Sequence, residues 1–453
     1  VIEHRLVNKI TNDSKIGTYK SSNKGYVDPI CIELIVDEID GNKYIKDLIV
    51  TQNESRWKRV EDADFVRKII ENNGTDGIDD VSGATVTSRA IKSATNRAIK
   101  ESKGIVADNT TIVDTNIKSP DEIFNGAEGT RLSPYLIENE DVLIDFAKSV
   151  NKYTYEGKYI KLNEDILLTR EWVPAGSFKA PFEGEFDGNN KKISNIYVGN
   201  YENPKVVNDV AGLFSSFGDN AYIHDLKLDF EAYVTSNKNF RVGALVGYNY
   251  GAKIENIDAF SNIFAKSDEA KNIYVGGIVG EIRNGKLLNS TSEVSLRGEV
   301  RGGLSQVGGL VGMSNRGLIA NSLANGKISA TADRVMEGMP VMGGIVATNG
   351  GTTVNNYSNV MISSDVYSKY LGTITGWATG ISDNYQNYTR EKRKITVDSK
   401  NENKREFSIP YGFVVGASIN EYGEKNTGSV IIDARTFNAV SYTHLRAHET
   451  PEH

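Results

Sequence analysis

Gly243-Ala-Leu-Val-Gly, Gly276-Gly-Ile-Val-Gly, Gly308-Gly-Leu-Val-Gly, Gly343-Gly-Ile-Val-Ala and Gly372-Thr-Ile-Thr-Gly are versions of one short sequence. Together with Gly212-Leu-Phe-Ser they recur about every 32 residues. Short strand patterns and Gly/Asn turns separate them, without helical spacing. One such repeat cannot bury its apolar face alone, whereas stacked repeats can. The pattern therefore predicts an all-β, right-handed parallel β-helix (a solenoid) with one coil per repeat.

A second strand follows each block after about ten residues and carries a polar residue in register. These polar residues are Asp225, Asn256, Asn289, Asn321 and Asn356. Side-chain amides at one position of successive coils can stack and bond to one another. The series therefore predicts a polar ladder along the solenoid. We interpret Glu183 and Asp187 as turn residues, not as the acid and base of a glycosidase.

We place the solenoid at residues 129–390 and a C-terminal β extension at 391–440. A helix is predicted at about 140–150, beginning near Asn139, with an apolar face made of Leu143, Phe146, Ala147 and Val150. A bare solenoid end exposes strand edges, so this helix is expected to cap the N-terminal end.

The repeat region resembles the Gly-Leu-x-Gly (GLUG) repeat family of bacterial surface proteins. The resemblance rests on the repeats and on their lead-in, which comprises Pro134 to Ile137, Tyr155 to Tyr159, Phe182 to Asn189, and Ile193 to Asn195. It implies a β-helix of the kind found in adhesins, in surface proteases and as stalks. A shared fold does not choose among these functions.

The first 103 residues have a different pattern, which predicts a small α+β domain. Strands are expected at 29–36 and 44–50, joined as a hairpin by the turn Asp40-Gly41-Asn42. Helices are expected at about 60–72 and from the motif at 79–89 through Lys100. The single cysteine, Cys31, lies in an apolar run and is expected to be a buried strand residue.

Asp79-Asp80-Val81-Ser82-Gly83-Ala84-Thr85-Val86-Thr87-Ser88-Arg89 opens the second of these helices. Unpaired backbone N–H groups at a helix N-terminus favour a phosphate, and Gly83 lets the backbone come close to it. A plain N-cap by Thr85, Thr87 or Ser88 would explain the same hydroxyls without a ligand. Spacing alone favours the plain cap.

Residues 15–100 as a whole resemble the FMN-binding domain family, whose signature Asp-x-x-Ser/Thr-Gly-Ala-Thr is matched by Asp79 through Thr85. In that family a flavin transferase attaches FMN through its phosphate to the final threonine, outside the cytoplasm. The resemblance implies a covalent FMN phosphoester on Thr85. It makes Asp79, Ser82, Gly83 and Ala84 the recognition sequence, and Thr87 is counted with the cofactor-binding residues.

The stretch Asn53-Glu54-Ser55-Arg56-Trp57 departs from the Glu-Thr-Pro-Gly of many relatives, which helps to wall the flavin. Trp57 is interpreted either as a stacking partner of the flavin ring or as an ordinary packed aromatic. No Gly-x-Gly-x-x-Gly fingerprint is present, so direct hydride transfer from NADH is not expected.

Net charge and cysteine content exclude some classes of function. A net charge of −7 gives no support to nucleic-acid binding, and one cysteine excludes a multi-cysteine metal site. No metal ligands are predicted. Residues 104–128 are expected to be a linker. The tail 441–453 resembles a translated sequencing adaptor, and we expect it to be non-native. Because the chain starts at Val1, we expect that a signal and an anchor have been lost.

Two functions from different classes remain. The favoured one is an extracytoplasmic electron-transfer flavoprotein, at the cell surface or secreted, whose solenoid is a spacer or docking surface toward an unknown redox partner. The rival is a surface adhesin that binds a ligand through the solenoid and carries an accessory flavin domain. The front half of a larger surface enzyme is a weaker option. The sequence has no His-Glu-x-x-His and no complete catalytic site.

Overall fold

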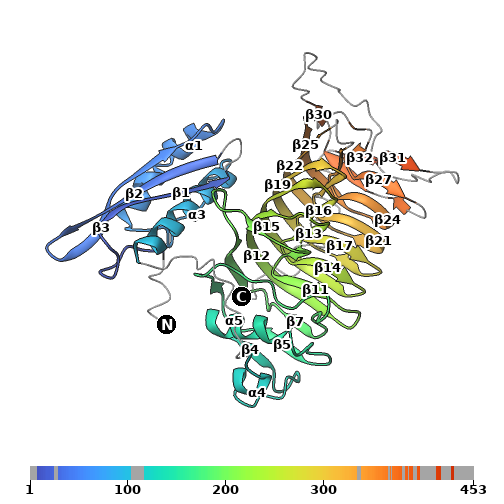
Figure 1. Ribbon diagram of the computed structural model, residues 1–453, viewed down its shortest axis with the longest axis horizontal. Helices are drawn as coiled ribbons and strands as arrows, with labels where there is room; N and C mark the ends of the chain where they lie inside the picture. Colours follow the sequence, from blue (N-terminus) through green and yellow to red (C-terminus); the bar gives the residue numbers. More distant parts are fainter. Residues whose placement is uncertain are drawn as a thin grey trace, which may run out of the picture. The chain divides into compact units, whose positions relative to one another are not determined.

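The computed structural model describes residues 8–24, 29–103, 117–333, 338–365, 368, 370–379, 383–385, 387–390, 395–397, 415–419 and 430–432. The chain divides into two compact units, an N-terminal domain within residues 1–114 and a solenoid that takes most of the remainder. Each unit has its own hydrophobic core. The expected multidomain fold, a small domain of helices and strands followed by a parallel solenoid, is confirmed (Figure 1).

The N-terminal domain packs three helices with a three-stranded antiparallel sheet. Its strands lie in the order β1 (Gly17–Lys24), β2 (Pro29–Ile39) and β3 (Asn42–Thr51). The helices are α1 (Trp57–Asp62), α2 (Phe65–Glu71) and α3 (Thr85–Ser102). The expected hairpin is β2–β3, and its turn residues Asp40 and Gly41 have φ of 50° and 76°, which suits a tight hairpin turn.

Three details of this domain differ from the sequence expectations. Strand β1 was not predicted, and it pairs with β2 along its whole length. The single helix expected at 60–72 is divided into α1 and α2, because Asp64 has a left-handed backbone with φ of 52°. Cys31 is exposed, which corrects the expectation of a buried thiol. Alternation along β2 puts Ile30 and Ile32 in the core and turns Cys31 outward.

The solenoid consists of short parallel strands that pair with their counterparts on the next coil, over about six turns (Figure 1). One sheet is six-stranded and contains β10 (Val210–Ala211), β13 (Phe240–Gly243), β16 (Ile273–Gly276), β20 (Leu304–Gly308), β23 (Met339–Gly343) and β26 (Leu371–Gly372). The other strands of the first coils are β4 (Tyr135–Ile137), β5 (Tyr159–Leu162), β6 (Ile166–Leu167), β7 (Glu185–Asp187), β8 (Lys192–Val198), β9 (Lys205–Val206), β11 (Phe214–Phe217), β12 (Tyr222–Thr235), β14 (Val246–Tyr250) and β15 (Lys253–Ala270).

The later coils repeat the same arrangement toward the C-terminus. Their strands are β17 (Val279–Arg283), β18 (Lys286–Leu288), β19 (Thr291–Gly302), β21 (Val311–Ala320), β22 (Leu323–Ala332), β24 (Val346–Val354), β25 (Tyr357–Ser364), β27 (Thr375–Thr379), β28 (Asp383–Tyr385) and β29 (Tyr388–Arg390). Three further strands, β30 (Ile395–Val397), β31 (Val415–Ile419) and β32 (Val430–Ile432), fall in the expected extension and pair in parallel with β25, β27 and β29. The expected non-native tail, 441–453, lies outside the described residues.

The glycine-rich blocks form the stacked column that the repeat predicts. Val246 pairs with Val279, and Val279 pairs with Val311 on the next coil. Each block turns the chain sharply between two strands. A Cβ on Gly276 or Gly308 would lie 1.9 Å from the carbonyl oxygen three residues later. Only glycine permits this close approach, which explains why the blocks repeat it.

The polar ladder is present with one correction. Its members share a left-handed backbone, with φ of 50–54°, and are Asp225, Asn256, Asn289, Asn321 and Asn355, not Asn356. The Nδ2 of Asn355 donates to Oδ1 of Asn321 at 2.8 Å, and the Nδ2 of Asn321 donates to Oδ1 of Asn289 at 3.2 Å. Asn356 is fully buried and accepts from the backbone of Ser322 at 3.0 Å. Of these two neighbouring asparagines, Asn355 therefore belongs to the ladder, and Asn356 belongs to the buried interior of the solenoid.

The end of the solenoid is closed as expected, and the predicted linker is partly structured. Helix α5 (Glu140–Ser149) begins after Asn139, whose Oδ1 accepts from the backbone of Val142 at 3.0 Å. Its expected apolar residues are all buried. Within the expected linker, residues 104–116 lie outside the described residues, whereas α4 (Pro120–Ile123) has a capping box at Ser119 and contributes to the solenoid core. The linker assignment was therefore too long at its C-terminal end.

Replacement of Phe146 with alanine should reveal how much the cap contributes. The ring is fully buried and lies 5.1 Å from the ring of Tyr155 and 5.9 Å from that of Phe182, between centroids. Phe146→Ala is expected to lower the free energy of unfolding of the solenoid by about 3–5 kcal/mol, measured by chemical denaturation. Lys148→Ala, on the exposed side of α5, should change it by less than about 0.5 kcal/mol. Equal effects of both variants would contradict the assignment of α5 as a packed cap.

Candidate functional site

The first turn of α3 has an open N-terminus. Thr85 is its first residue, and the N-cap residue Ala84 has φ of −137° and ψ of 31° without a side-chain cap bond. The plain N-cap that spacing favoured is therefore not the arrangement found. Gly83 has φ of 74°, a left-handed conformation that brings the backbone into a tight turn before the helix. Such a helix end offers its N–H groups and the positive end of its dipole to an anion.

The three hydroxyls of this turn lie in different surroundings. Thr87 is 1% exposed, and its Oγ1 donates to Oε2 of the buried Glu54 at 2.7 Å. Ser88 is fully buried and accepts from the backbone of Val81 at 3.1 Å. Thr85 is only half-buried. Among the three hydroxyl-bearing residues of this turn, Thr85 is the one that is not fully buried.

Two arginines of the α1 region contact the loop before Thr85, and sequence reasoning missed both. Nη1 of Arg56 donates to the carbonyl oxygen of Gly83 at 2.9 Å. Nη1 of Arg59 lies 3.5 Å from the carbonyl oxygen of Ser82 and 2.3 Å from where a Cβ on Gly83 would stand. Arg56 is the N-cap residue of α1 and Arg59 lies in the first turn of that helix. A spacing of three residues at a helix start is a signal that could have found them. The structure thus brings two guanidinium groups to the predicted motif.

The two aspartates at the start of the motif lie in different surroundings. Asp79, expected as part of the recognition sequence, is exposed, and so is Ser82. The neighbouring Asp80 is mostly buried and forms ion pairs with Nε of Arg89 at 2.5 Å and Nζ of Lys92 at 2.7 Å. Burial opposes ionisation of Asp80, but Lys92 and Arg89 outweigh it and hold its pKa below the usual range. Asp80 thereby ties the loop to α3.

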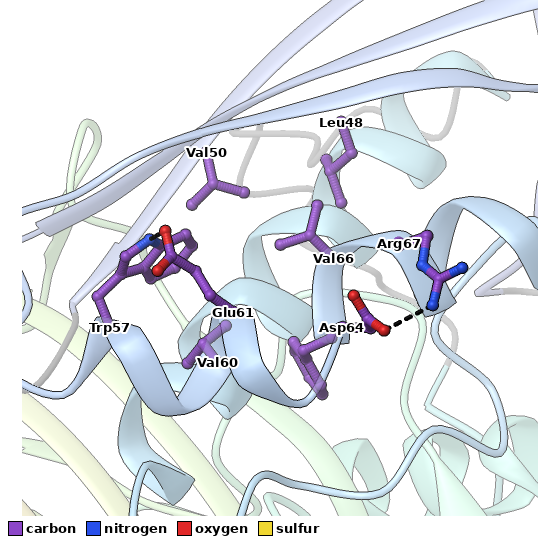
Figure 2. A pocket seen from close by; sticks show the side chains of 9 residues that line it. Leu48, Val50, Trp57, Val60, Glu61, Asp64, Val66 and Arg67 are labelled. Carbon is purple, nitrogen blue, oxygen red and sulfur yellow. Dashed lines mark hydrogen bonds and ion pairs between the residues drawn. The ribbon is translucent and has the colours of Figure 1, made fainter.

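An apolar pocket of about 350 Å³ lies between β3 and the helices α1 and α2. Figure 2 shows its lining, which is Leu48, Val50, Trp57, Val60, Glu61, Asp64, Phe65, Val66 and Arg67. Trp57 is partly buried, and its Nε1 donates to Oε1 of Glu61 at 2.7 Å. Trp57 therefore packs against the core, as one of its two interpretations expects, and it also lines this pocket. Its stacking on a flavin ring stays a prediction.

A family model matches the N-terminal domain. Residues 25–100 match the model of the FMN-binding domain family, so the chain contains an FMN-binding domain. A protein of Evansella cellulosilytica, described as a Gly-rich membrane protein, is 34% identical over 146 residues, which are 30% of this chain. The chain covers 15% of the length of that relative. Among the residues that the structure describes, no helix is both long and apolar enough to cross a membrane.

Two solved structures are similar to part of this chain. One, described as an immunoglobulin A1 protease from Bacteroides ovatus, is 19% identical, covers 71% of this chain and 91% of its own, and has a TM-score of 0.45. The other, an IgA1 protease, is 13% identical, covers 58% of this chain and 22% of its own, and has a TM-score of 0.35.

The ion pairs of Asp80 predict a pH-dependent effect. Asp80→Asn removes a carboxylate that is bonded to two cations, and should lower the free energy of unfolding of the N-terminal domain by about 1–3 kcal/mol at pH 7. Because the folded-state pKa of Asp80 is lowered, its stabilisation is present above the ordinary aspartate pKa and is lost as the pH falls through the folded value. Denaturation curves of both proteins should therefore converge in acid. If the difference in free energy of unfolding between the wild type and Asp80→Asn grew below about pH 4, the ion pairs of Asp80 would not be its cause.

Proposed function

We propose that the chain is an extracytoplasmic flavoprotein that holds FMN through a phosphoester on Thr85 and serves in electron transfer. The observation that supports this most directly is the position of Thr85, a half-buried hydroxyl residue at the start of α3. The family match to an FMN-binding domain supplies the identity of the cofactor.

The surroundings of Thr85 suit a phosphate group. A phosphodiester retains one negative charge, which the free N–H groups of the α3 N-terminus favour. Arg56 and Arg59 already contact the two carbonyls before it and are both exposed. A small rotation of either side chain would exchange a neutral carbonyl for a charged phosphate oxygen, which is the stronger acceptor. The turn at Gly83 keeps side-chain bulk away from this region.

Helix α1 also offers a surface for the flavin ring. Arg59 of this helix contacts the loop of Ser82 and Gly83, and Trp57 and Val60 of the same helix line the apolar pocket. In the proposal, Trp57 and Val60 would hold the flat flavin ring, with Trp57 as its aromatic contact. When bound, FMN supplies the redox chemistry, and the chain supplies retention and placement.

A covalent bond has a physical purpose beyond the cytoplasm, because a lost cofactor would not be replaced from a cellular pool. The proposal requires a flavin transferase for maturation and a separate redox partner. In it, the solenoid is a spacer or a docking surface for that partner. The Evansella cellulosilytica relative is described as a membrane protein, which supports a site of action at a membrane.

Replacement of Thr85 tests the attachment. When the chain is exported by a host with the flavin transferase, the intact mass of the wild type should increase by FMN less one water, and its denatured band should fluoresce. Thr85→Ala should lose all covalent flavin, because no hydroxyl remains to form the ester. Thr85→Ser keeps a hydroxyl and should retain part of the modification.

Lys58→Ala serves as a control on the exposed face of α1 and should be flavinylated like the wild type. Circular dichroism should show that all four proteins are folded. A colourless wild type, or a Thr85→Ala protein that still carries covalent flavin, would overturn the proposal.

A further inference from the structure

A histidine and three carboxylates meet on the outer surface of the first coils of the solenoid. His224 on β12 pairs directly with Asp187 on β7, so the two residues occupy the same position on stacked coils. Asp225 follows His224, and Glu185 lies two residues before Asp187. The side chains of His224 and Asp187 are both 12% exposed. Stacking thus brings together groups that are far apart in the sequence.

Both nitrogens of the imidazole face carboxylate oxygens. Nδ1 of His224 lies 2.7 Å from Oδ2 of Asp225 and 3.9 Å from Oδ1 of Asp187, and Nε2 lies 3.1 Å from Oε1 of Glu185. A neutral imidazole has one N–H and can donate to only one of these partners. The arrangement therefore needs a second positive centre, either a proton or a metal ion at the other nitrogen.

We propose that Asp187, His224 and Asp225 bind a divalent transition-metal ion, with Nδ1 of His224 as the nitrogen ligand. Glu185 then accepts the proton on Nε2, as carboxylates commonly do behind a metal-bound histidine. The candidate ligand atoms all lie within 4.8 Å of one another. Two ligand atoms on a tetrahedral zinc ion lie roughly 3.3 Å apart, between the 2.7 and 3.9 Å found here.

The carboxylates are oriented from behind by other coils. The hydroxyl of Tyr159 donates to Oδ2 of Asp187, and Nδ2 of Asn256 donates to Oδ1 of Asp225. These bonds leave Oδ2 of Asp225 directed at the imidazole. Oδ1 of Asp187 also faces Nδ1 of His224 and accepts in addition from the backbone N–H of Asn189 at 2.7 Å. Carboxylates that are oriented by hydrogen bonds from neighbouring side chains are typical ligands of metal sites.

The charge balance favours a divalent ion. Three carboxylates, those of Glu185, Asp187 and Asp225, face the ring, and Nη2 of Arg131 pairs with Oε1 of Glu185 at 2.6 Å. With a neutral histidine, three negative charges and one positive charge leave a net charge of −2 in a partly buried cluster. Such an excess is unfavourable without a cation.

The ligand types restrict which metal ion the site can bind. One imidazole and two carboxylates suit zinc and its neighbours, whereas calcium prefers a shell made of oxygen alone. The ring plane is fixed by Tyr222, which stacks on His224 with centroids 4.4 Å apart. Three protein ligands leave a fourth position for water. The site would connect two coils next to the capped end of the solenoid.

Zinc itself is the probe for the test. Full-length wild type, His224→Gln and Asp187→Asn would be equilibrated with Zn²⁺, dialysed, and analysed for metal per chain. The wild type should retain one more zinc than either variant, and Zn²⁺ should raise the unfolding temperature of the wild type only. The tail histidines His444, His448 and His453 are present in every protein, so their contribution cancels.

Two further variants separate metal binding from a general loss of charge. Glu185→Gln should weaken zinc binding by about tenfold to a hundredfold, because it loosens the imidazole without removing a ligand. Asp229→Asn removes a carboxylate of β12 that pairs with Lys192 outside the cluster, and should bind zinc like the wild type. Equal zinc content in the wild type and folded His224→Gln would overturn the proposal. Retention of calcium in preference to zinc would also overturn it.

Discussion

The solenoid depends on one interaction, the backbone hydrogen bonding between equivalent residues on successive coils. Each short strand leaves its N–H and C=O groups unpaired within its own coil, and the next coil satisfies them in parallel register. Because like residues then stack on like residues, the Val246 column and the Asn ladder follow from the same register. The close turn at Gly276 is the local condition that lets each coil close.

The same register also brings polar side chains from different coils together on the surface of the solenoid. His224 and Asp187 belong to different coils and face each other because their strands pair. The N-terminal domain works differently, since its candidate site is built from one helix end and one neighbouring helix. Each of the two units has its own hydrophobic core, as separate domains do.

Periodic features could be predicted from the sequence, and features set by contact between distant segments could not. The repeat predicted the column that contains Val279, and helical spacing predicted the cap that contains Phe146. Both were predictable because burial imposes a regular spacing of apolar residues along the sequence. The ladder was misplaced by one residue, Asn356 for Asn355, since two neighbouring asparagines differ only in backbone conformation. Cys31 was taken as buried because an apolar run hides the alternation of a strand with one exposed face.

The candidate flavin site shows the same division. The motif around Thr85 is contiguous and was found, whereas Arg56 approaches Gly83 across 27 positions of sequence. Helical spacing of Arg56 and Arg59 marks a shared face but does not say what that face contacts. Likewise, Glu185 and His224 are 39 positions apart, and only the coil length brings them together.

The central claim, that flavin is held at Thr85 through a phosphoester, is tested most directly by phosphorus NMR on the exported, denatured and dialysed protein. A phosphodiester has no group that titrates between pH 5 and 8, whereas the phosphate of free FMN is a monoester with a second pKa near 6. The account predicts one phosphorus signal whose chemical shift is constant over this range and which is absent from Thr85→Ala. A signal that moves with a midpoint near pH 6, or one that dialysis removes, would contradict it.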